Sequence, residues 1–417
     1  MEPYILHAFH AENFRQFSKI SVLFNKKFNF LTGPNGCGKS SILEGIQHSL
    51  YSDWTSSRLN ENSCFSTEIQ TNTKVIFSGL GKNSFHSSNT YRNNSLRNWE
   101  RPEIPYCTEK NDKEYITTHP SNESIRTIVP LFLGTKRSID YKRIDGARRE
   151  ETSEQYIGAY KQKNIRSENS NVKQWFINRY FFIDKEWATY ERANWQKLID
   201  NLPRIAPFDS DFKYVKIGRD LEPIFSLYGQ ECYLEELSSG FQAIFSIIAN
   251  IIEWIEKINE GDLRDIHQAT GTVLIDELDL HLHPEWQFNI RDGLVTIFPK
   301  LQFIVTTHSP HMLSSAKEGE VIIMSRLNGK SEYEFSPTNK RYSGWNTDQI
   351  LEDVMGVKSL KNKEYEQLIE ESLVAYEDKN KIKLNELLSK LKSVAHTNDV
   401  ILQVLEIRLA SLELNND

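Results

Sequence analysis

A glycine-rich loop near the beginning of the chain gives the strongest chemical signal. Residues 33–40 read GPNGCGKS and fit the pattern GxxxxGK(S/T), with a strand pattern before them and a helix pattern after them. The glycines of such a loop let backbone N–H groups surround a phosphate, and the N-terminus of the following helix points at it. Lys39 can neutralise phosphate oxygens, and the Ser40 hydroxyl can bind Mg²⁺. The loop therefore predicts a site for a triphosphate with Mg²⁺.

Two carboxylates follow a second, strongly apolar segment. Residues 272–277 read TVLIDE, and the apolar run predicts a strand that is buried on both faces. Asp276 and Glu277 then emerge at its C-terminal end, where open α/β sheets bind ligands. Asp276 would hold Mg²⁺ through water, and Glu277 would orient and polarise an attacking water. Taken alone, the same pattern also fits a strand that ends in a solvated acidic turn.

Two more segments could complete this site. Residues 237–242 read LSSGFQ and precede an apolar helix, so Ser238 and Gly240 lie where unsatisfied N–H groups can bind an anion. Residues 303–310 read FIVTTHSP and predict a second buried strand, which delivers His308 to the same edge of the sheet. Singly, the first segment is an ordinary helix start and the second carries an ordinary structural histidine.

The order of the four segments decides between these interpretations. The phosphate loop comes first, followed by the Ser-Gly helix start, the strand with Asp-Glu and the strand with His. The last three lie within about 70 residues, in a β/α pattern that one domain can hold. Four independent coincidences in this order are improbable, so the segments are interpreted together as one nucleotide site.

This ordered set resembles the ABC-type ATPase heads of the SMC, RecF and OLD group. The resemblance covers residues 1–50 and 230–325 and is weak between them. Residues 13–17 resemble the entry sequence of these heads, 33–41 their Walker A motif, 237–242 the signature, 272–277 Walker B, Asp279 the D-loop and His308 the switch histidine.

The resemblance implies an α/β fold of the ABC-ATPase class, with a mixed sheet and a P-loop core. Residues 1–50 and 205–345 are expected to form the ATPase core. Residues 51–204 are expected to be an inserted α+β region of strands, loops and helices, and residues 346–417 a helical region that docks a partner.

The resemblance also assigns roles within the site. It implies ATP as the ligand, with Mg²⁺ held by Ser40 and Asp276 and with Glu277 and His308 as the catalytic residues. Ser238 and Gly240 of one subunit would touch the γ-phosphate bound to the other, across a head-to-tail homodimer or a larger homo-oligomer. The implied nucleotide contacts are Arg15, Asn35, Gly36, Gly38, Lys39, Ser40, Ser41, Ser238, Gly240 and Asp279.

Two departures from the family pattern affect these expectations. The usual LSGGQ signature reads LSSGF here, with Ser239 in place of a glycine and Phe241 in place of glutamine. Because the motif is altered, a nucleotide-gated scaffold with little ATP turnover remains an alternative function. The Q-loop glutamine has only two weak candidates, Gln70 and Gln155.

Within the group, the chain looks like the nuclease-less ATPases of prokaryotic antiphage modules. It has no heptads before the signature and too short a tail for the nuclease domain of OLD proteins. The segment 344–357 resembles ATPases of Septu-type and retron-linked systems, and this resemblance implies a separate effector, such as an HNH-type nuclease. The alternative is a RecF-like repair ATPase that binds duplex DNA through the basic residues Lys136, Arg137, Lys142, Arg143, Arg148 and Arg149.

Composition sets the remaining bounds. The formal charge of −7 and pI near 6.0 give no global reason to expect nucleic-acid binding. No basic and apolar leader begins the chain, and no apolar run reaches the ~18 residues that a membrane span needs, so a cytoplasmic protein without a membrane partner is expected. The four cysteines lack metal or CxxC spacing and are interpreted as free thiols, and the pair His281 and His283 lacks the further ligands of a zinc site.

Overall fold

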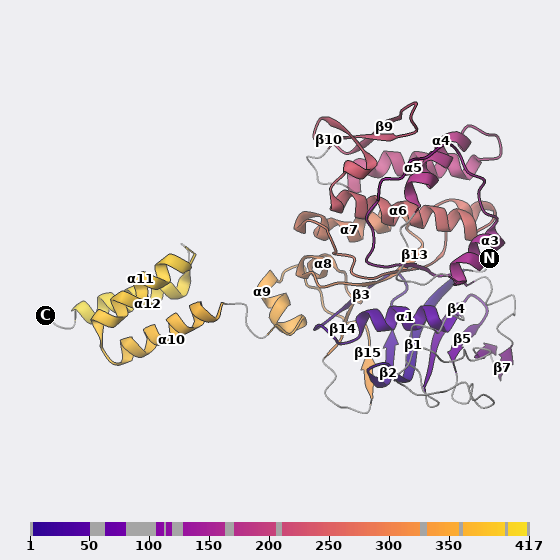
Figure 1. The fold of residues 1–417 in the computed structure, drawn as a ribbon. Helices are drawn as coiled ribbons and strands as arrows, with labels where there is room; N and C mark the ends of the chain where they lie inside the picture. The colour runs from indigo at the N-terminus through magenta and orange to yellow at the C-terminus, as the bar shows by residue number, and fades with distance from the viewer. Residues whose placement is uncertain are drawn as a thin grey trace, which may run out of the picture. The chain divides into compact units, whose positions relative to one another are not determined.

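The computed structural model describes residues 3–50, 63–80, 106–111, 114–118, 128–162, 171–205, 211–325, 332–357, 362–396 and 399–414. The chain forms two compact units, Met1–Ile350 and Leu351–Asp417 (Figure 1). The predicted division into core, insertion and docking region remains a prediction.

A parallel sheet forms the centre of the first unit, with strand order β14-β3-β13-β12-β8. Its three middle strands are buried along their whole length, as expected for apolar runs with helices on both faces. The apolar segment at 128–133, which has the composition of a buried strand, forms a strand over residues 131–133. The strands are β3 (Phe28–Thr32), β8 (Leu131–Leu133), β12 (Gly271–Ile275), β13 (Leu301–Thr306) and β14 (Val321–Ile323).

A second, largely antiparallel sheet has the order β15-β2-β1-β4-β5-β6-β7. Helix α1 (Lys39–Leu50) lies between the two sheets and contacts β1, β4, β5 and β13 (Figure 1). The side chain of Gln302 on β13 joins the sheets, because it exchanges two hydrogen bonds with the backbone of Leu6 at 2.9 and 2.8 Å. The strands are β1 (Tyr4–Phe14), β2 (Phe17–Leu23), β4 (Cys64–Thr71), β5 (Val75–Leu80), β6 (Tyr106–Asn111), β7 (Glu114–Thr118) and β15 (Tyr333–Phe335).

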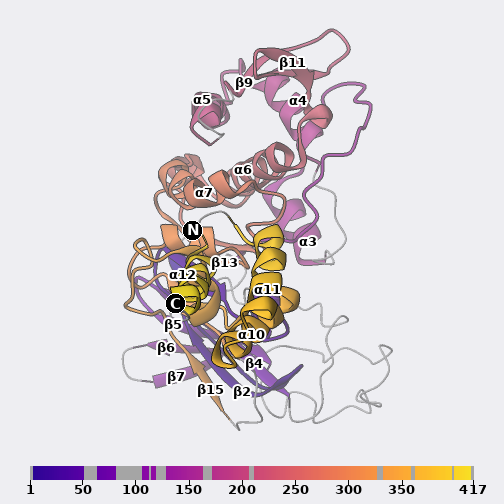
Figure 2. The same ribbon diagram turned by 90° about the vertical axis from the view of Figure 1, so that its left-hand side faces the viewer.

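Helices and a small sheet cover the other face of the parallel sheet. Helices α6 and α7 lie next to the sheet, and α4, α5 and the three-stranded sheet β11-β10-β9 lie beyond them (Figures 1 and 2). The predicted α/β class with a P-loop core is confirmed by these layers. The elements are α3 (Ser153–Gln162), α4 (Val172–Phe182), α5 (Thr189–Ile205), β9 (Lys213–Ile217), β10 (Pro223–Leu227), β11 (Gln230–Tyr233), α6 (Ser239–Ile258), α7 (Pro284–Ile297) and α8 (Pro310–Ser315).

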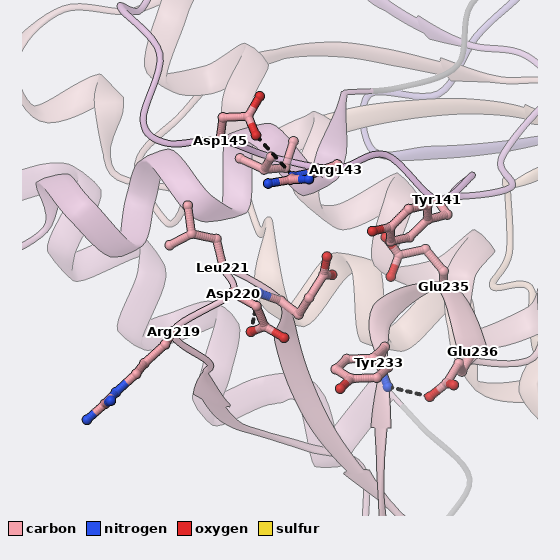
Figure 3. A pocket seen from close by; sticks show the side chains of 11 residues that line it. Tyr141, Arg143, Asp145, Arg219, Asp220, Leu221, Tyr233, Glu235 and Glu236 are labelled. Carbon is pink, nitrogen blue, oxygen red and sulfur yellow. Dashed lines mark hydrogen bonds and ion pairs between the residues drawn. The ribbon is translucent and has the colours of Figure 1, made fainter.

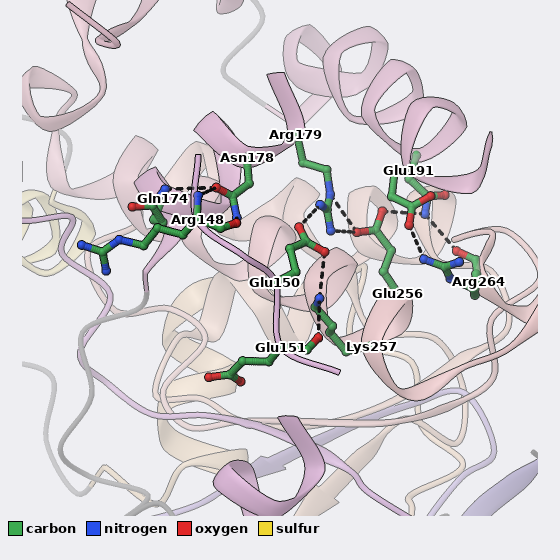
Figure 4. A network of polar contacts seen from close by, with 11 residues as sticks. Arg148, Glu150, Glu151, Gln174, Asn178, Arg179, Glu191, Glu256, Lys257 and Arg264 are labelled. Atoms are coloured by element: carbon green, nitrogen blue, oxygen red, sulfur yellow. Dashed lines mark hydrogen bonds and ion pairs between the residues drawn. The ribbon is translucent and has the colours of Figure 1, made fainter. Parts of the chain in front are cut away.

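A buried polar network holds the inserted helices to α6 (Figure 4). The guanidinium of Arg179 on α4 pairs with Glu256 on α6 and with Glu150, and Glu150 also pairs with Lys257 at 2.8 Å. Asn194 on α5 donates to the second oxygen of Glu256 at 3.0 Å. Because a buried charge that loses its partner is costly, these contacts favour one arrangement of α4, α5 and α6.

The second unit is a bundle of three helices, α10 (Lys363–Glu377), α11 (Lys381–Val394) and α12 (Val400–Leu414). It follows the short helix α9 (Thr347–Gln349) and a π-helical turn at Ile350–Val354. Among the helices of the described residues, none is both long and apolar enough to cross a membrane. The leucines of the bundle core recur at spacings of three and four residues, as in amphipathic helices. The core consists of Ala375, Leu384, Leu387, Leu388, Leu391, Leu402 and Leu405.

Candidate functional site

Four strands end side by side at the predicted site. β3, β13, β12 and β8 are parallel neighbours, and the register pairs Leu31 with Thr306 and Ile275 with both Val305 and Leu133. The carboxyl ends of parallel strands meet at one edge of a sheet, which is the usual ligand edge of open α/β folds. The phosphate loop (residues 33–41), the Asp-Glu pair and the His308 segment therefore share this edge.

The backbone of the phosphate loop has the conformation that its glycines were expected to allow. Gly33, Gly36 and Gly38 have φ values of +138°, +79° and +99°. A side chain at Gly33 would also place its Cβ 2.1 Å from the backbone oxygen of Met324, so no larger residue fits. The loop leads directly from β3 into α1, and the N-terminal N–H groups of α1 are available to an anion.

Lys39 is the buried cation of the loop. Lys39 is 6% exposed, and its ammonium donates to the backbone oxygens of Gly33 at 2.9 Å and Pro34 at 3.2 Å. Burial lowers the pKa of Lys39, while Cys37 and the carboxylates of Asp276 and Glu277 oppose this shift. The partners of this buried ammonium are two backbone oxygens and the Cys37 thiol, at 3.8 Å. It is therefore suited to bind phosphate oxygens, which carry full negative charge.

Two oxygen ligands converge at the edge. The Ser40 hydroxyl donates to Oδ1 of Asp276 at 2.9 Å, and the Thr306 hydroxyl donates to the same oxygen at 2.7 Å. Mg²⁺ prefers hard oxygen ligands and is commonly held by one or two protein groups, with waters and phosphate oxygens completing the shell. Ser40 and Asp276 fit this requirement, and Thr306 fixes the carboxylate from the side of β13.

Glu277 lies in a left-handed backbone conformation, with φ of +51°. Its N–H donates to the Thr306 hydroxyl at 2.7 Å, and its carbonyl oxygen accepts from Arg137 and from the N–H of Leu280, both at 3.0 Å. Left-handed backbone is unfavourable for a residue with a side chain and persists only where neighbours hold it. These contacts hold the Glu277 backbone on both sides of its Cα.

Asp279 and His308 meet beyond Glu277. The N–H of His308 donates to Oδ1 of Asp279 at 3.1 Å. Desolvation lowers the pKa of His308, and the nearby positive charge of Lys39 lowers it further, against the opposing charges of Asp279, Glu277 and Asp276. The imidazole is therefore neutral at neutral pH and can accept a hydrogen bond or donate one.

Arg15 lies beside the first turn of α1. Its guanidinium pairs with Glu44 on α1 and donates to the Ser41 hydroxyl at 3.2 Å. The residue forms the turn between β1 and β2, with φ of +53°. The contact with Ser41 brings Arg15 next to the phosphate loop, while its predicted role at the adenosine or α-phosphate remains a prediction. Asn35 and Gly36 are exposed at the tip of the loop.

The signature segment (residues 237–242) begins α6. Ser238 is the exposed N-cap, and its side chain makes no capping hydrogen bond. A side chain at Gly240 would place its Cβ 2.4 Å from the ring of Trp286, so the glycine allows α6 to approach α7. In the described part of the chain, no hydrogen bond joins Ser238 or Gly240 to the phosphate loop of the same molecule.

The unusual residue of this segment, Phe241, is a packing residue. It is 5% exposed, and its ring contacts Trp286 and Phe212 edge-on, with centroid distances of 4.6 and 4.8 Å. The next residue, Gln242, donates to the backbone oxygens of Glu235 at 2.9 Å and Leu237 at 2.8 Å. The signature turn is therefore fixed by the packing of Phe241 and the hydrogen bonds of Gln242, although position 241 lacks the usual glutamine.

Sequence reasoning missed the roles of Thr306, Gln242 and Arg137. Thr306 is the last residue of β13, inside the expected His308 segment, and could have been found from its place at the strand end. Arg137 was grouped with a basic patch for DNA, but it is 4% exposed and donates to backbone oxygens beside the Asp-Glu pair. It is therefore not available to DNA phosphates.

The two weak Q-loop candidates lie on other elements. Gln70 is exposed on β4 of the seven-stranded sheet, and the Gln155 amide oxygen accepts from the N–H of Thr152 at the start of α3. The strand next to β12 at the site is β8, and residues 134–137 that follow it contain no glutamine. The structure thus gives neither candidate a place at the strand ends.

The family model described as "AAA domain, putative AbiEii toxin, Type IV TA system" matches residues 28–314. This range contains the phosphate loop, the signature segment and the ends of β12 and β13. The chain belongs to this AAA domain family.

Individual proteins are also similar to this chain. A Septu protein PtuA from Bacillus thuringiensis is 31% identical over 405 residues, which cover 94% of each chain. A retron Vc95 "probable ATPase" from Vibrio cholerae is 35% identical over 161 residues, 37% of this chain and 30% of that protein. An SMC head domain from Thermotoga maritima covers 80% of this chain and 99% of its own, with 14% identity and a TM-score of 0.44. The predicted resemblance to the ATPases of Septu and retron systems is confirmed.

Proposed function

We propose that this protein binds ATP with Mg²⁺ at the shared strand edge, hydrolyses it, and closes head-to-tail with a second copy to control a separate effector in antiviral defence. The observation that carries the nucleotide site is the convergence of Ser40, Asp276 and Thr306 beside the buried ammonium of Lys39. Membership of the ATPase family supports ATP as the ligand. Its Septu and retron relatives support the role in defence.

The residues of the site have distinct tasks in this proposal. The loop N–H groups and Lys39 hold the phosphates, and Ser40 and Asp276 hold Mg²⁺, which would offset negative charge on the phosphates. Glu277 accepts a hydrogen bond from the attacking water and orients it in line with the γ-phosphate. His308 follows β13 at the same edge, where its imidazole can hydrogen-bond to the γ-phosphate or to the water.

A second copy would complete the site. Ser238 is exposed and carries no capping bond, so its hydroxyl and the N-terminal N–H groups of α6 remain available to an anion from outside. A head-to-tail pair would bring this helix start to the γ-phosphate of the partner. The proposed oligomer is therefore a nucleotide-dependent homodimer, or a larger assembly built from such dimers.

Replacing Ser238 by arginine is expected to prevent ATP-dependent dimerisation, because the longer side chain would occupy the space of the partner's phosphate. In a Glu277→Gln background, mass photometry with ATP and Mg²⁺ should show doubling of the mass, and Ser238→Arg should remove it while ATP still binds. Ser153→Arg, at the exposed start of α3, is the matched control and should dimerise normally. Dimerisation of the Ser238→Arg protein would refute the head-to-tail arrangement.

The effector is proposed to dock on the helical unit. Helix α12 carries three exposed apolar residues, Val400, Val404 and Ile407, which are 70%, 42% and 70% exposed. Their spacing of four and three residues places them on one stripe of the helix. Exposed apolar side chains gathered on one stripe are typical of a binding surface. This unit is therefore proposed as the surface that holds a nuclease partner.

The double substitution Val400→Asp and Ile407→Asp is expected to abolish copurification of a co-expressed HNH-type nuclease as effector, because two charges would have to be buried in the contact. The matched control is Asn385→Asp with Ser389→Asp, which adds the same number of charges at exposed positions of α11 in the same unit and should retain the effector. ATP turnover of the protein with Val400→Asp and Ile407→Asp should remain near that of the wild type. Retention of the nuclease by this protein would exclude the stripe as its docking surface.

A further inference from the structure

Arg137 is a buried cation directly behind the Asp-Glu pair. It follows β8, is 4% exposed, and donates through Nε to the Gly134 oxygen at 3.1 Å. Its two terminal nitrogens donate to the backbone oxygens of Asp276 and of Glu277, the latter at 3.0 Å. One planar guanidinium thus joins the end of β8 to two consecutive peptide groups at the end of β12.

These partners are unusual for a buried arginine. Buried charges are normally paired with an opposite charge, as Arg179 is with Glu256 in the same protein. Desolvation lowers the pKa of Arg137 to about 10, and the charges of Asp276, Asp279 and Glu277 oppose this shift. A charged group that is held by backbone oxygens, at a cost in solvation, is well placed to fix the course of that backbone.

Arg137 binds the backbone at Glu277, which has an unfavourable conformation. Glu277 has φ of +51°, a conformation that is unfavourable for a residue with a side chain. Thr306 binds its N–H at 2.7 Å, and Arg137 binds its carbonyl oxygen. The direction of the Glu277 side chain depends on this backbone conformation, since φ fixes the direction of the Cα–Cβ bond relative to the strand.

The segment that carries Arg137 is itself fixed. The N–H of Ile139 donates to the Gln242 amide oxygen at 2.9 Å. The amide nitrogen of Gln242 binds the backbone of the signature turn, at Glu235 and Leu237. Residues 134–139 are therefore anchored to the end of β12 through Arg137 and to α6 through Gln242. Such anchoring keeps the guanidinium in one place.

On the basis of the proposed hydrolysis, we propose that Arg137 is a positioning residue: it holds the left-handed turn at Glu277 and so aims the carboxylate at the attacking water. It is buried and donates to backbone oxygens, so its proposed effect on the attacking water is exerted through Glu277. Its removal should therefore lower kcat and leave ATP binding and KM close to those of the wild type, because the phosphate loop and Lys39 are unchanged.

The test is Arg137→Ala, assayed for steady-state ATP turnover and for ATP affinity. We expect kcat to fall by about 10- to 100-fold, the size of effect that follows from a small misplacement of a catalytic group. Millimolar guanidinium chloride should restore part of the lost kcat, because the free ion can fill the space and bind the same carbonyl oxygens. Arg143→Ala is the matched control, since Arg143 lies in the same loop, is 84% exposed and pairs with Asp145 at 3.2 Å (Figure 3).

Arg143 lines a pocket of about 750 Å³ with Tyr141, Asp220 and Glu235 (Figure 3). Its substitution should change neither kcat nor the guanidinium response. Unchanged kcat in Arg137→Ala, or a loss that guanidinium does not restore, would overturn the positioning role.

Arg137→Lys keeps the buried charge and covers the case in which the alanine variant does not fold. An ammonium cannot supply three donors in one plane, so kcat should again fall with KM preserved. A lysine variant with the wild-type kcat would contradict the proposal. These results differ from those expected if the proposed ATP hydrolysis itself is wrong. In that case the wild-type protein would hydrolyse no ATP, and the Glu277→Gln protein would not differ from it.

Discussion

Replacing Glu277 by glutamine is expected to reduce ATP turnover at least about 100-fold and to leave ATP binding intact. The amide has nearly the shape of the carboxylate, but it carries no charge and cannot polarise the attacking water. A 100-fold loss corresponds to about 2.7 kcal/mol of transition-state stabilisation. The contacts that bind phosphate, from Lys39 and the loop, do not involve the Glu277 side chain.

The measurement is phosphate release under single-turnover and steady-state conditions, beside a titration with a fluorescent ATP analogue. Glu260→Gln is the matched control, because Glu260 is exposed after the C-terminal end of α6 and has no place in the site. Normal turnover in Glu277→Gln would remove Glu277 from the water-orienting role. Very slow turnover in the wild type, equal to that of the variant, would favour a nucleotide-gated scaffold.

Replacing Lys39 by alanine is expected to abolish nucleotide binding. Truncating one partner of a desolvated charge pair costs about 2–5 kcal/mol, and Lys39 is the buried cation of the phosphate loop. Desolvation already lowers its pKa, and a bound triphosphate would raise that pKa again by supplying negative charge. The ammonium is therefore poised to gain more from phosphate than an exposed lysine would.

Calorimetric titration with ATP and Mg²⁺ measures this loss directly. Lys26→Ala is the control, because Lys26 is exposed at the β2–β3 turn of the same unit. The Lys39→Ala protein should remain folded, since the ammonium binds only two backbone oxygens and a thiol, at 2.9, 3.2 and 3.8 Å. An unchanged ATP affinity in this variant would refute the role of the phosphate loop.

The sequence predicted the parts of the site that depend on local patterns. The glycine loop, the apolar runs of β12 and β13 and the start of α6 all have short signatures, and each forms the element expected of it. Their meeting at one edge followed from the rule that parallel strands share a carboxyl end. The helical region that was expected at 346–417 likewise contains the helices α10, α11 and α12.

The remaining features depend on pairings between distant residues. Arg137 reaches Glu277 across 140 residues, because β8 happens to be the neighbour of β12. Strand β15 pairs with β2 although the chain between them holds most of the protein. Phe241 looked like a defect in the signature, and only its contacts with Trp286 and Phe212 show that it is a core residue. No local pattern carries this information.

The nucleotide that the Glu277→Gln protein retains shows whether intact ATP is bound at the phosphate loop. The protein is mixed with ATP and Mg²⁺, freed of unbound nucleotide and denatured, and the released nucleotide is identified and counted by chromatography. We expect one intact ATP for each chain, and none in the same protein with Lys39→Ala. Retained ADP in place of ATP, or equal retention with and without Lys39, would contradict this expectation.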